Sequence, residues 1–270
     1  MKAMTGFDPL PTMRESAYRH PLVIRGGGMD IHKPKPWHGW REFLKEYLIV
    51  VVGVLTALGA EQLVEEIDWS HRVRGAEEAM RAELRQDERD AYFLLSTAPC
   101  NAAKLDEIQH DLTASREYGA LIPTVTPYRM VLRPWSSDAW DSAKSMQIIS
   151  HISNERLQLY SFDYVFTAAL RQGMEREMAA QNALNTIAIN AGRLQPAERD
   201  RLFQALVATR GAMRDMDNSA MYLLSASKPL GLQLSPKEQA AELRDARSQR
   251  GDCATAPALV DVAADRHPIS

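Results

Sequence analysis

The sequence predicts an all-α protein: a single N-terminal transmembrane helix followed by an antiparallel helical bundle of roughly four or five main helices. Three observations lead to this prediction. A charge-free apolar run extends from Tyr47 to Ala60. Apolar residues then recur at helical spacing through most of the later chain, with capping residues and prolines where helices start. The composition, with 12 Met and only 7% aromatic residues, also suits helices.

The apolar run can span a bilayer only together with its flanking residues. The run itself covers about 14 residues, or roughly 21 Å of helix, whereas the hydrocarbon core is about 30 Å thick. Phe43 to Val64 covers about 22 residues and about 33 Å, and Lys45 can extend its ammonium group to the interface. The run is apolar on all sides, unlike a surface helix of a soluble domain. We therefore predict a transmembrane helix at residues 43–64, with a buried soluble helix and a cleaved signal peptide as the alternatives.

Aromatic and charged residues predict the orientation of this helix. Aromatic side chains that mark a membrane interface stand at both ends, with Trp37, Trp40 and Tyr47 at one end and Trp69 at the other. Basic residues gather before the helix and acidic residues directly after it, which places the N-terminus in the cytoplasm. The basic residues are Lys33, Lys35, Arg41 and Lys45, and the acidic ones are Glu65, Glu66 and Asp68. The helical domain is therefore expected in the periplasm, at the bacterial inner membrane.

These assignments divide the chain into parts with different surroundings. The residues before Met29 include a Gly26-Gly27-Gly28 triplet and are predicted to be disordered, and both Met1 and Met29 are candidate start residues. The parts are a cytoplasmic tail at 1–42 (1–28 disordered), the transmembrane helix at 43–64, a periplasmic helical domain at 65–253 and a loose tail at 254–270.

Local signals place the helices of the periplasmic domain. Helix is expected from near Gly39 through the span and an amphipathic stretch, and Pro99 is expected in the first turn of a new helix. Prolines between residues 119 and 134 predict an irregular crossover with a short strand pair. A short helix is expected around Trp140, after a cap at Ser136-Ser137-Asp138. A long helix is expected from Ser153-Asn154 to Gly192, and another begins at Pro196. The last helix is expected to start at the capping box Ser235-Pro236-Lys237-Glu238 and to end near Arg250-Gly251.

The sequence contains two cysteines, Cys100 and Cys253. In an oxidising compartment an even pair indicates a disulfide. This bond would close a loop of about 150 residues and stabilise the fold by about 4–5 kcal/mol on the chain-entropy model. The alternative is two unrelated, small buried residues. Neither cysteine has a histidine at the spacing of a zinc site, so no metal centre is expected there.

The most distinctive cluster in the outer domain combines two indoles with charged side chains. A ligand or partner pocket lined by aromatic groups with a few polar ones would have this composition. The alternative is that both indoles pack beneath the crossover segment and that Asp138 serves the start of a helix. The candidate pocket residues are Trp135, Asp138, Trp140, Asp141 and Lys144.

Aromatic residues also alternate along the next predicted helix, at Tyr160, Phe162, Tyr164 and Phe166. On a helix this spacing points them in several directions, because successive residues are about 100° apart. Core packing accounts for some of them, and others are candidates for a surface that contacts a partner.

The sequence contains no catalytic or cofactor motif that points to a reaction. It has no HExxH, GxSxG or CxxC motif and no glycine-rich phosphate loop, and Glu107 with His110 forms a single Glu-x-x-His pair without a second copy. A net charge of -3 does not indicate nucleic-acid binding. We therefore expect no enzyme activity, no cofactor and no metal.

These exclusions favour a membrane-anchored periplasmic interaction or scaffold protein. The expected partners are the lipid bilayer and either another protein or a second copy of the chain. A periplasmic small-molecule sensor that works with a partner is the first alternative, and an uncharacterised enzyme is the second.

Two stretches carry a resemblance to known proteins. The first is WHGWREFLKEY at residues 37–47 with the apolar run and Glu61-Gln62, and the second is AWDSAKS at residues 139–145 with Leu157 and Tyr160. They resemble a family of uncharacterised bacterial proteins with a short cytoplasmic tail, a single span and a helical outer domain. The resemblance begins at about Met29 and implies this topology. Because that family has no assigned activity, the resemblance implies no catalytic or binding residue.

Overall fold

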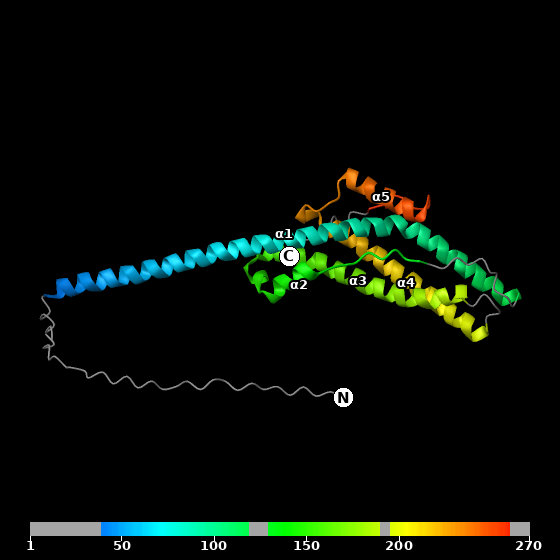
Figure 1. Cartoon of the computed structure of the whole chain (residues 1–270), viewed down its shortest axis with the longest axis horizontal. Coiled ribbons are helices and arrows are strands. Elements are labelled where there is room, and N and C mark those ends of the chain that lie inside the picture. The colour runs from blue at the N-terminus through cyan, green and yellow to red at the C-terminus, as the bar shows by residue number, and fades with distance from the viewer. Residues whose placement is uncertain (1–38, 119–128, 190–194, 260–270) are drawn as a thin grey trace, which may run out of the picture. The chain divides into compact units, whose positions relative to one another are not determined.

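A computed structural model describes residues 39–118, 129–189 and 195–259. The described residues form α-helices and short 3-10 helices and contain no strand, which confirms the predicted all-α class (Figure 1). The chain divides into two compact units, Met1–Leu58 and Gly59–Ser270. The elements are α1 (Gly39–Tyr118), α2 (Asp138–Ser145), η1 (Ile148–His151), α3 (Asn154–Ile189), α4 (Pro196–Ala226), η2 (Lys228–Leu230) and α5 (Pro236–Arg250).

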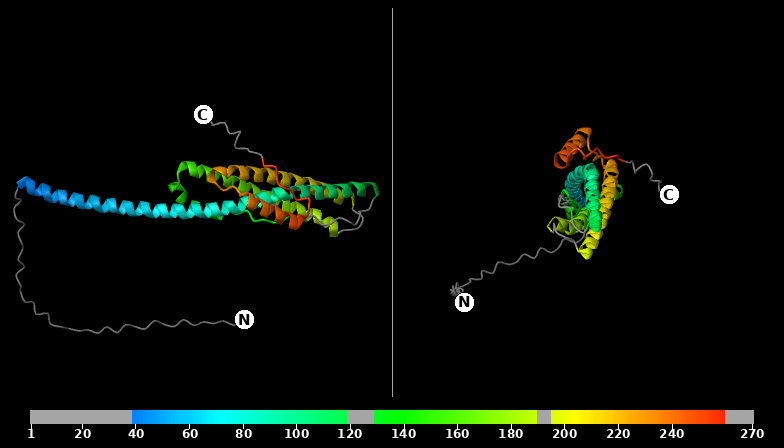
Figure 2. Two further views of the ribbon diagram at one scale, coloured as in Figure 1. Left: turned by 90° about the horizontal axis from the view of Figure 1, so that it is seen from above. Right: turned by 90° about the vertical axis from the view of Figure 1, so that its right-hand side faces the viewer.

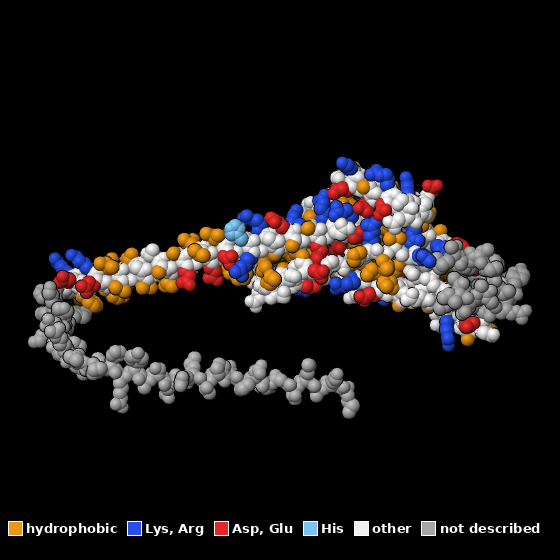
Figure 3. Space-filling view, viewed as in Figure 1, with side chains coloured by type: hydrophobic (Ala, Val, Ile, Leu, Met, Phe, Trp, Pro, Cys, Tyr) orange, Lys and Arg blue, Asp and Glu red, His pale blue; other side chains and the backbone are white. Residues whose placement is uncertain are grey.

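The described part of the first unit is the beginning of α1. Its side chains are mostly apolar and exposed, and orange hydrophobic groups follow one another along this part of the helix in Figure 3. Among the described residues, α1 is the one helix with the length and composition to cross a membrane, and none of its most apolar 18-residue window is buried. Trp40 and Tyr47 of the predicted membrane interface are exposed here, whereas Trp37 lies outside the described residues.

The helix α1 does not end before Pro99, so the prediction of a new helix at this proline was wrong. Proline removes one backbone donor from the helix. Two hydroxyl groups in the preceding turn bond to backbone carbonyls: Ser96 Oγ donates to Tyr92 O at 2.8 Å and Thr97 Oγ1 to Leu94 O at 3.0 Å. Phe93 before the proline and Leu105 after it are both buried, so packing on each side favours continued helix over the local signal. The second half of α1 bends in Figure 1, as helices containing proline often do.

In the second unit, the apolar core forms along α1, α3 and α4. One cluster combines Leu105, Ile108 and Leu112 of α1 with α3 and α4, and another combines Ala91 and Leu95 of α1 with the same two helices. A third cluster joins Val73, Met80 and Leu84 of α1 to the short elements α2, η1 and η2 and to the start of α3. Figures 1 and 2 show α3 and α4 side by side along the second half of α1. The long helices therefore share one extended apolar contact.

The helices α3 and α4 approach closely at Gly173. A Cβ atom placed on this glycine would lie only 2.3 Å from Met216 Cγ. Met216 is itself buried, and its side chain fills the space that any larger residue at position 173 would occupy. The glycine thus allows the two helices to pack at this distance.

The predicted helix starts agree with the structure where the signal is local. The helix α3 begins at Asn154 and α4 at Pro196, whose N-cap Gln195 forms a capping box with Glu198. The Ser235–Glu238 capping box precedes α5 as predicted, with the Glu238 N–H donating to Ser235 Oγ at 3.4 Å. Ser137 stands at the N-cap of α2, but its hydroxyl does not bond to the backbone of that helix.

Parts of the predicted crossover and tail can be compared with the structure. Residues 129–137 of the crossover have no regular secondary structure, so the predicted strand pair is absent from the described part, while residues 119–128 and Gly192 lie outside it. At the predicted tail, Ala254 is fully buried and the Thr255 N–H donates to Ser96 O at 3.1 Å. The first residues of this tail are therefore held against α1.

Candidate functional site

The two tryptophans of the predicted pocket pack into different apolar clusters. Trp135 is buried among Leu170, Met216 and neighbouring residues of α3 and α4. Trp140 is partly buried in the cluster around Leu84, and its ring stacks on Tyr164 with centroids 5.2 Å apart. The cavity that Trp135 lines does not include Trp140. The structure thus places the two indoles in separate surroundings, and a ligand held by both remains only a prediction.

The charged residues of the predicted pocket surround Trp140 on α2. Lys144 Nζ lies 2.7 Å from Asp141 Oδ1 and 5.7 Å from the centroid of the Trp140 ring. The Asp141 carboxylate also accepts a hydrogen bond from Ser137 Oγ at 2.9 Å. Hydrogen bonds from Lys144 and from Ser137 lower the pKa of Asp141. Asp138 is exposed in the first turn of α2, where a carboxylate stabilises a helix start.

Glu83 of α1 connects α2 and α3, and the sequence analysis did not identify it. Its Oε2 accepts hydrogen bonds from Ser136 Oγ and from the Ala139 N–H, both at 3.0 Å. Its Oε1 accepts from the Tyr164 hydroxyl at 2.8 Å. Burial, followed by the bond to Glu83, raises the pKa of Tyr164 above its usual value. A single carboxylate therefore fixes the start of α2 and the ring on which Trp140 stacks.

Asp87 lies one turn further along the same face of α1. It is almost completely buried, and its Oδ2 accepts a hydrogen bond from Thr167 Oγ1 at 2.9 Å. Burial, with smaller contributions from the nearby Glu83 and Asp90 carboxylates, raises the pKa of Asp87 to about 8, although the Thr167 hydrogen bond opposes the rise. Near neutral pH this carboxyl group is therefore largely protonated.

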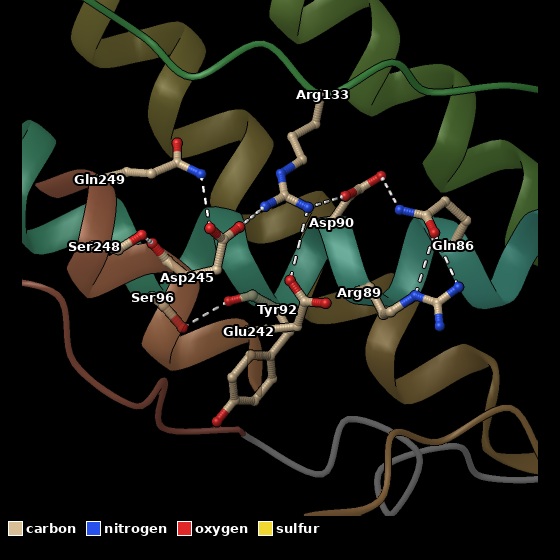
Figure 4. A network of polar contacts seen from close by, with 10 residues as sticks. All are labelled: Gln86, Arg89, Asp90, Tyr92, Ser96, Arg133, Glu242, Asp245, Ser248 and Gln249. Atoms are coloured by element: carbon tan, nitrogen blue, oxygen red, sulfur yellow. Dashed lines mark hydrogen bonds and ion pairs between the residues drawn. The ribbon is translucent and has the colours of Figure 1, made fainter. Parts of the chain in front are cut away.

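Arg133 of the crossover segment links α1 to α5 (Figure 4). Its Nη1 lies 2.7 Å from Asp90 Oδ1, and its Nη2 lies 2.5 Å from Asp245 Oδ2. Glu242 of α5 contributes a more distant oxygen at 3.7 Å. The guanidinium group also lies over the Phe93 ring, 3.9 Å from its centroid, which is a cation–π arrangement. One side chain thus neutralises the buried Asp90 and contacts two carboxylates of another helix.

A small cavity lies beside Trp135, between α1, the crossover segment, α3 and α4. Its volume of about 20 Å³ is enough for roughly one water molecule. Its wall includes buried Asn101, whose Oδ1 has no hydrogen-bond partner among the described residues, and buried Glu177. Burial, together with the nearby Glu177 carboxylate, raises the pKa of Asp217 to about 7. The cavity therefore suits a single water-sized group that donates hydrogen bonds, and it is too small for a drug-sized ligand.

The predicted cysteine pair is bonded in the structure. Cys100 of α1 and Cys253, which follows α5, form a disulfide across 153 positions of sequence. Cys100 is buried with Phe93, Ala246 and Ala254, whereas Cys253 is exposed. The bond therefore joins the chain after α5 to the C-terminal part of α1.

The described residues offer little for metal chemistry. They contain no group of three His, Cys, Asp or Glu side chains that could hold a metal ion. In the Glu107–His110 pair, the His110 side chain is exposed and its Nδ1 lies 3.5 Å from Asp111 Oδ1. This geometry fits a solvated surface pair.

The structure places Trp69, predicted at the membrane interface, against η1. Its ring stacks on His151 with centroids 3.8 Å apart, and Arg72 lies over the same indole at 5.1 Å from the centroid. Arg72 Nη2 also pairs with Asp68 Oδ2 at 2.6 Å. Trp69 thus joins α1 to η1 within the helical domain.

Comparisons of the chain with protein-family models, with curated proteins and with solved structures found no match.

Proposed function

We propose that this chain is a single-pass inner-membrane protein whose periplasmic helical domain, an antiparallel bundle, binds another protein or a second copy of the chain. The observation that carries the proposal is the exposed apolar beginning of α1, where Leu48, Ile49 and Leu55 are all more than half exposed. In water, each such side chain would forgo about 1.5–3 kcal/mol of burial energy. A bilayer removes this cost, because lipid is the natural solvent for a helix apolar on all sides.

The charge distribution and the disulfide support the proposed orientation. Arg41 and Lys45 lie at the N-terminal end of the apolar stretch, and acidic residues follow its other end. This asymmetry favours a cytoplasmic N-terminus. The Cys100–Cys253 bond would persist in an oxidising compartment but not in a reducing cytoplasm. The two arguments are independent, and both support a domain outside the cytoplasm.

An exposed aromatic surface on α3 and α4 supports a role in binding a protein. Phe162, Val165 and Tyr222 are exposed by 38%, 58% and 44%. Phe166 lies between them, edge-on to Phe162 at 4.9 Å and stacked on Tyr222 at 5.3 Å. Aromatic side chains of this kind are enriched in protein interfaces, where they contribute much of the binding energy.

A reporter experiment tests the proposed topology. Alkaline phosphatase, which is active only in the periplasm, and a fluorescent protein that matures only in the cytoplasm are each fused after Ile67. Phosphatase activity without fluorescence is expected, together with recovery of the full-length chain in the detergent-extracted membrane fraction. Recovery of the intact chain in the soluble extract would contradict the membrane proposal.

A cross-linking experiment tests the proposed interaction surface. A photoreactive amino acid at Val165 in the full chain should capture a defined protein or a second copy of the chain in membranes. The same group at Val207, which is 69% exposed on α4, serves as the control because it lies outside the aromatic surface. Equal capture from both positions, or none from Val165, would count against this surface.

A further inference from the structure

The helix α5 buries very little apolar surface. Among its residues from Pro236 to Arg250, only Ala246 is buried, and most of the others are charged or small. Hydrophobic stabilisation is roughly proportional to the apolar area removed from water, so one alanine contributes little. The position of α5 against α1, visible in Figures 1 and 2, therefore depends mainly on other interactions.

Ion pairs on one face of α5 supply part of its attachment. Glu238, Glu242 and Asp245 are spaced as i, i+4 and i+7, which places them on the same side of a helix. Glu238 Oε1 lies 2.8 Å from Arg85 Nη2, and Asp245 Oδ2 lies 2.5 Å from Arg133 Nη2. Pairs of this partly exposed kind are individually weak and are screened by salt.

Hydrogen bonds, the buried Ala254 and the disulfide hold the end of α5 and the residues that follow it. The Arg250 guanidinium donates to Arg129 O of the crossover segment. The helix ends at Arg250, and the disulfide from Cys253 to Cys100 follows within the next turn of chain. This bond is the one covalent tie between α5 and the described part of α1 apart from the chain itself.

The residues before α5 are anchored separately. Leu230 and Leu232 belong to the apolar cluster around Met80 and Leu84, and Leu234 is also buried. Apolar burial therefore holds the chain up to Leu234 without help from α5. If α5 moves away, the change can be confined to the chain after this residue.

We propose that α5 is a releasable cover over α1 and that the Cys100–Cys253 disulfide controls its release. A dithiol protein transfers two electrons and two protons to the disulfide, giving two cysteine thiols, and is itself oxidised to a disulfide. Cys253 is an exposed residue, which gives such a reductant access to this end of the bond. The inference depends only on the helical domain and is independent of the membrane proposal.

Release of α5 would change the surroundings of α1 at defined residues. It would uncover Phe93 and Cys100, which are 1% and 9% exposed. Arg85 would lose its α5 carboxylate, whereas Arg133 would keep its ion pair with the buried Asp90.

Alkylation of Cys100 tests the release directly. In the full chain with Cys253→Ser, Cys100 is a single free thiol beneath the cover, and its reaction with a maleimide reports opening. We expect alkylation at least tenfold faster than global unfolding of the same variant, measured by hydrogen exchange of α3 and α4. The further substitution Asp245→Asn should accelerate alkylation about fivefold, because it removes the ion pair with Arg133. A higher salt concentration should also accelerate alkylation, because salt screens such ion pairs.

The matched control removes an ion pair of the same type elsewhere. Asp215 of α4 pairs with Arg176 of α3, with Oδ2 and Nη1 3.1 Å apart. Asp215→Asn in the Cys253→Ser background should leave the alkylation rate of Cys100 unchanged. Equal acceleration by both substitutions, or alkylation only at the rate of global unfolding, would overturn the proposal.

Hydrogen exchange of the unaltered chain provides a second measurement that does not depend on a variant folding. Amides of residues 236–250 are followed in the full chain in detergent, before and after reduction. We expect their exchange to increase on reduction while that of α3 and α4 stays the same. Unchanged exchange of α5 would show that the disulfide does not control its release. An equal increase in all helices would show that α5 is part of one cooperative unit.

Discussion

At the scale of single residues, polar contacts over long sequence separations organise the helical domain. Glu83 bonds to a residue 81 positions later, Tyr164, and Arg133 bonds to one 112 positions later, Asp245. Neither partnership leaves a pattern in the local sequence. The Ser235–Glu238 capping box could be predicted because both residues lie within one helical turn. The sequence therefore reveals caps, whereas these networks become visible only when the helices are placed together.

The role of Glu83 can be tested by mutation. Glu83→Ala removes the acceptor for Ser136, Ala139 and Tyr164 together, and should lower the free energy of unfolding by about 2–4 kcal/mol. Tyr164→Phe removes only one donor and leaves Glu83 two others, so a loss of about 0.5–1.5 kcal/mol is expected. Urea unfolding of the full chain in mild detergent measures both. Similar losses for the two variants would show that Glu83 does not organise this region.

The predicted pocket illustrates why residue types alone are insufficient. Trp135 and Trp140 are neighbours in sequence with Asp138 between them, and this proximity suggested a shared site. The structure separates the indoles because Trp135 precedes α2 and packs towards α4, whereas Trp140 lies within α2 and packs on Tyr164. The start of α2 between them thus separates two residues that are close in sequence into different apolar clusters, which a sequence does not show.

At the scale of whole elements, packing overrides local signals in α1 and permits an unusual residue in α3. Pro99 is a local signal for a helix start, but α1 continues because buried residues before and after it face α3, α4 and α5. Gly173 is a poor helix former, yet it is accommodated where Met216 leaves no room for a side chain. Both features depend on neighbouring helices and were beyond prediction from the sequence.

Substitution of two glycines separates packing from helix propensity. Gly173→Ala improves the intrinsic helix propensity but forces a methyl group against Met216, so we expect a net loss of about 1–3 kcal/mol in stability. Gly211→Ala in α4 meets no atom within 4 Å and should instead add about 0.5–1 kcal/mol. Thermal unfolding of the full chain compares them. A gain in stability from both would mean that the α3–α4 contact yields easily.

At the scale of the whole molecule, buried acids should make stability dependent on pH. Burial raises the pKa of Asp87 to about 8, and burial also raises those of Glu88 and Asp217 to about 7. Unfolded carboxyl groups titrate near pH 4, so between about pH 4 and pH 8 the folded chain binds more protons than the unfolded chain. The stabilisation of the folded state by these protonated groups is therefore fully present below pH 4 and is lost as the pH rises towards 8.

A pH series measures this effect. The free energy of unfolding of the full chain should fall between pH 5.5 and pH 8, and Asp87→Asn should make the decrease smaller because one of the three titrating groups is removed. The control is Asp141→Asn, because the pKa of Asp141 is lowered rather than raised and the group stays ionised throughout this range. A flat profile, or equal slopes for all three proteins, would contradict the prediction.

The overall architecture was partly accessible from the sequence. The all-α class, the apolar helix and the cysteine pair could be predicted because each depends on composition or periodicity. The positions of Arg133 and α5 could not, because a polar helix with one buried residue carries no apolar stripe that would indicate its neighbour.

The wide sequence separation of these contacts has a consequence for biosynthesis. A ribosome releases Asp90 before Arg133 exists, and Cys100 must wait for the translation of 153 further positions before it meets Cys253. Buried acids on α1 would thus emerge without their counter-charges, and a nascent chain would expose a reactive thiol for most of its synthesis. Contacts between distant positions are slow to form, and transiently exposed apolar surface favours aggregation. The disulfide and the ion pair between Asp90 and Arg133 can therefore form only after much of the chain has been synthesised.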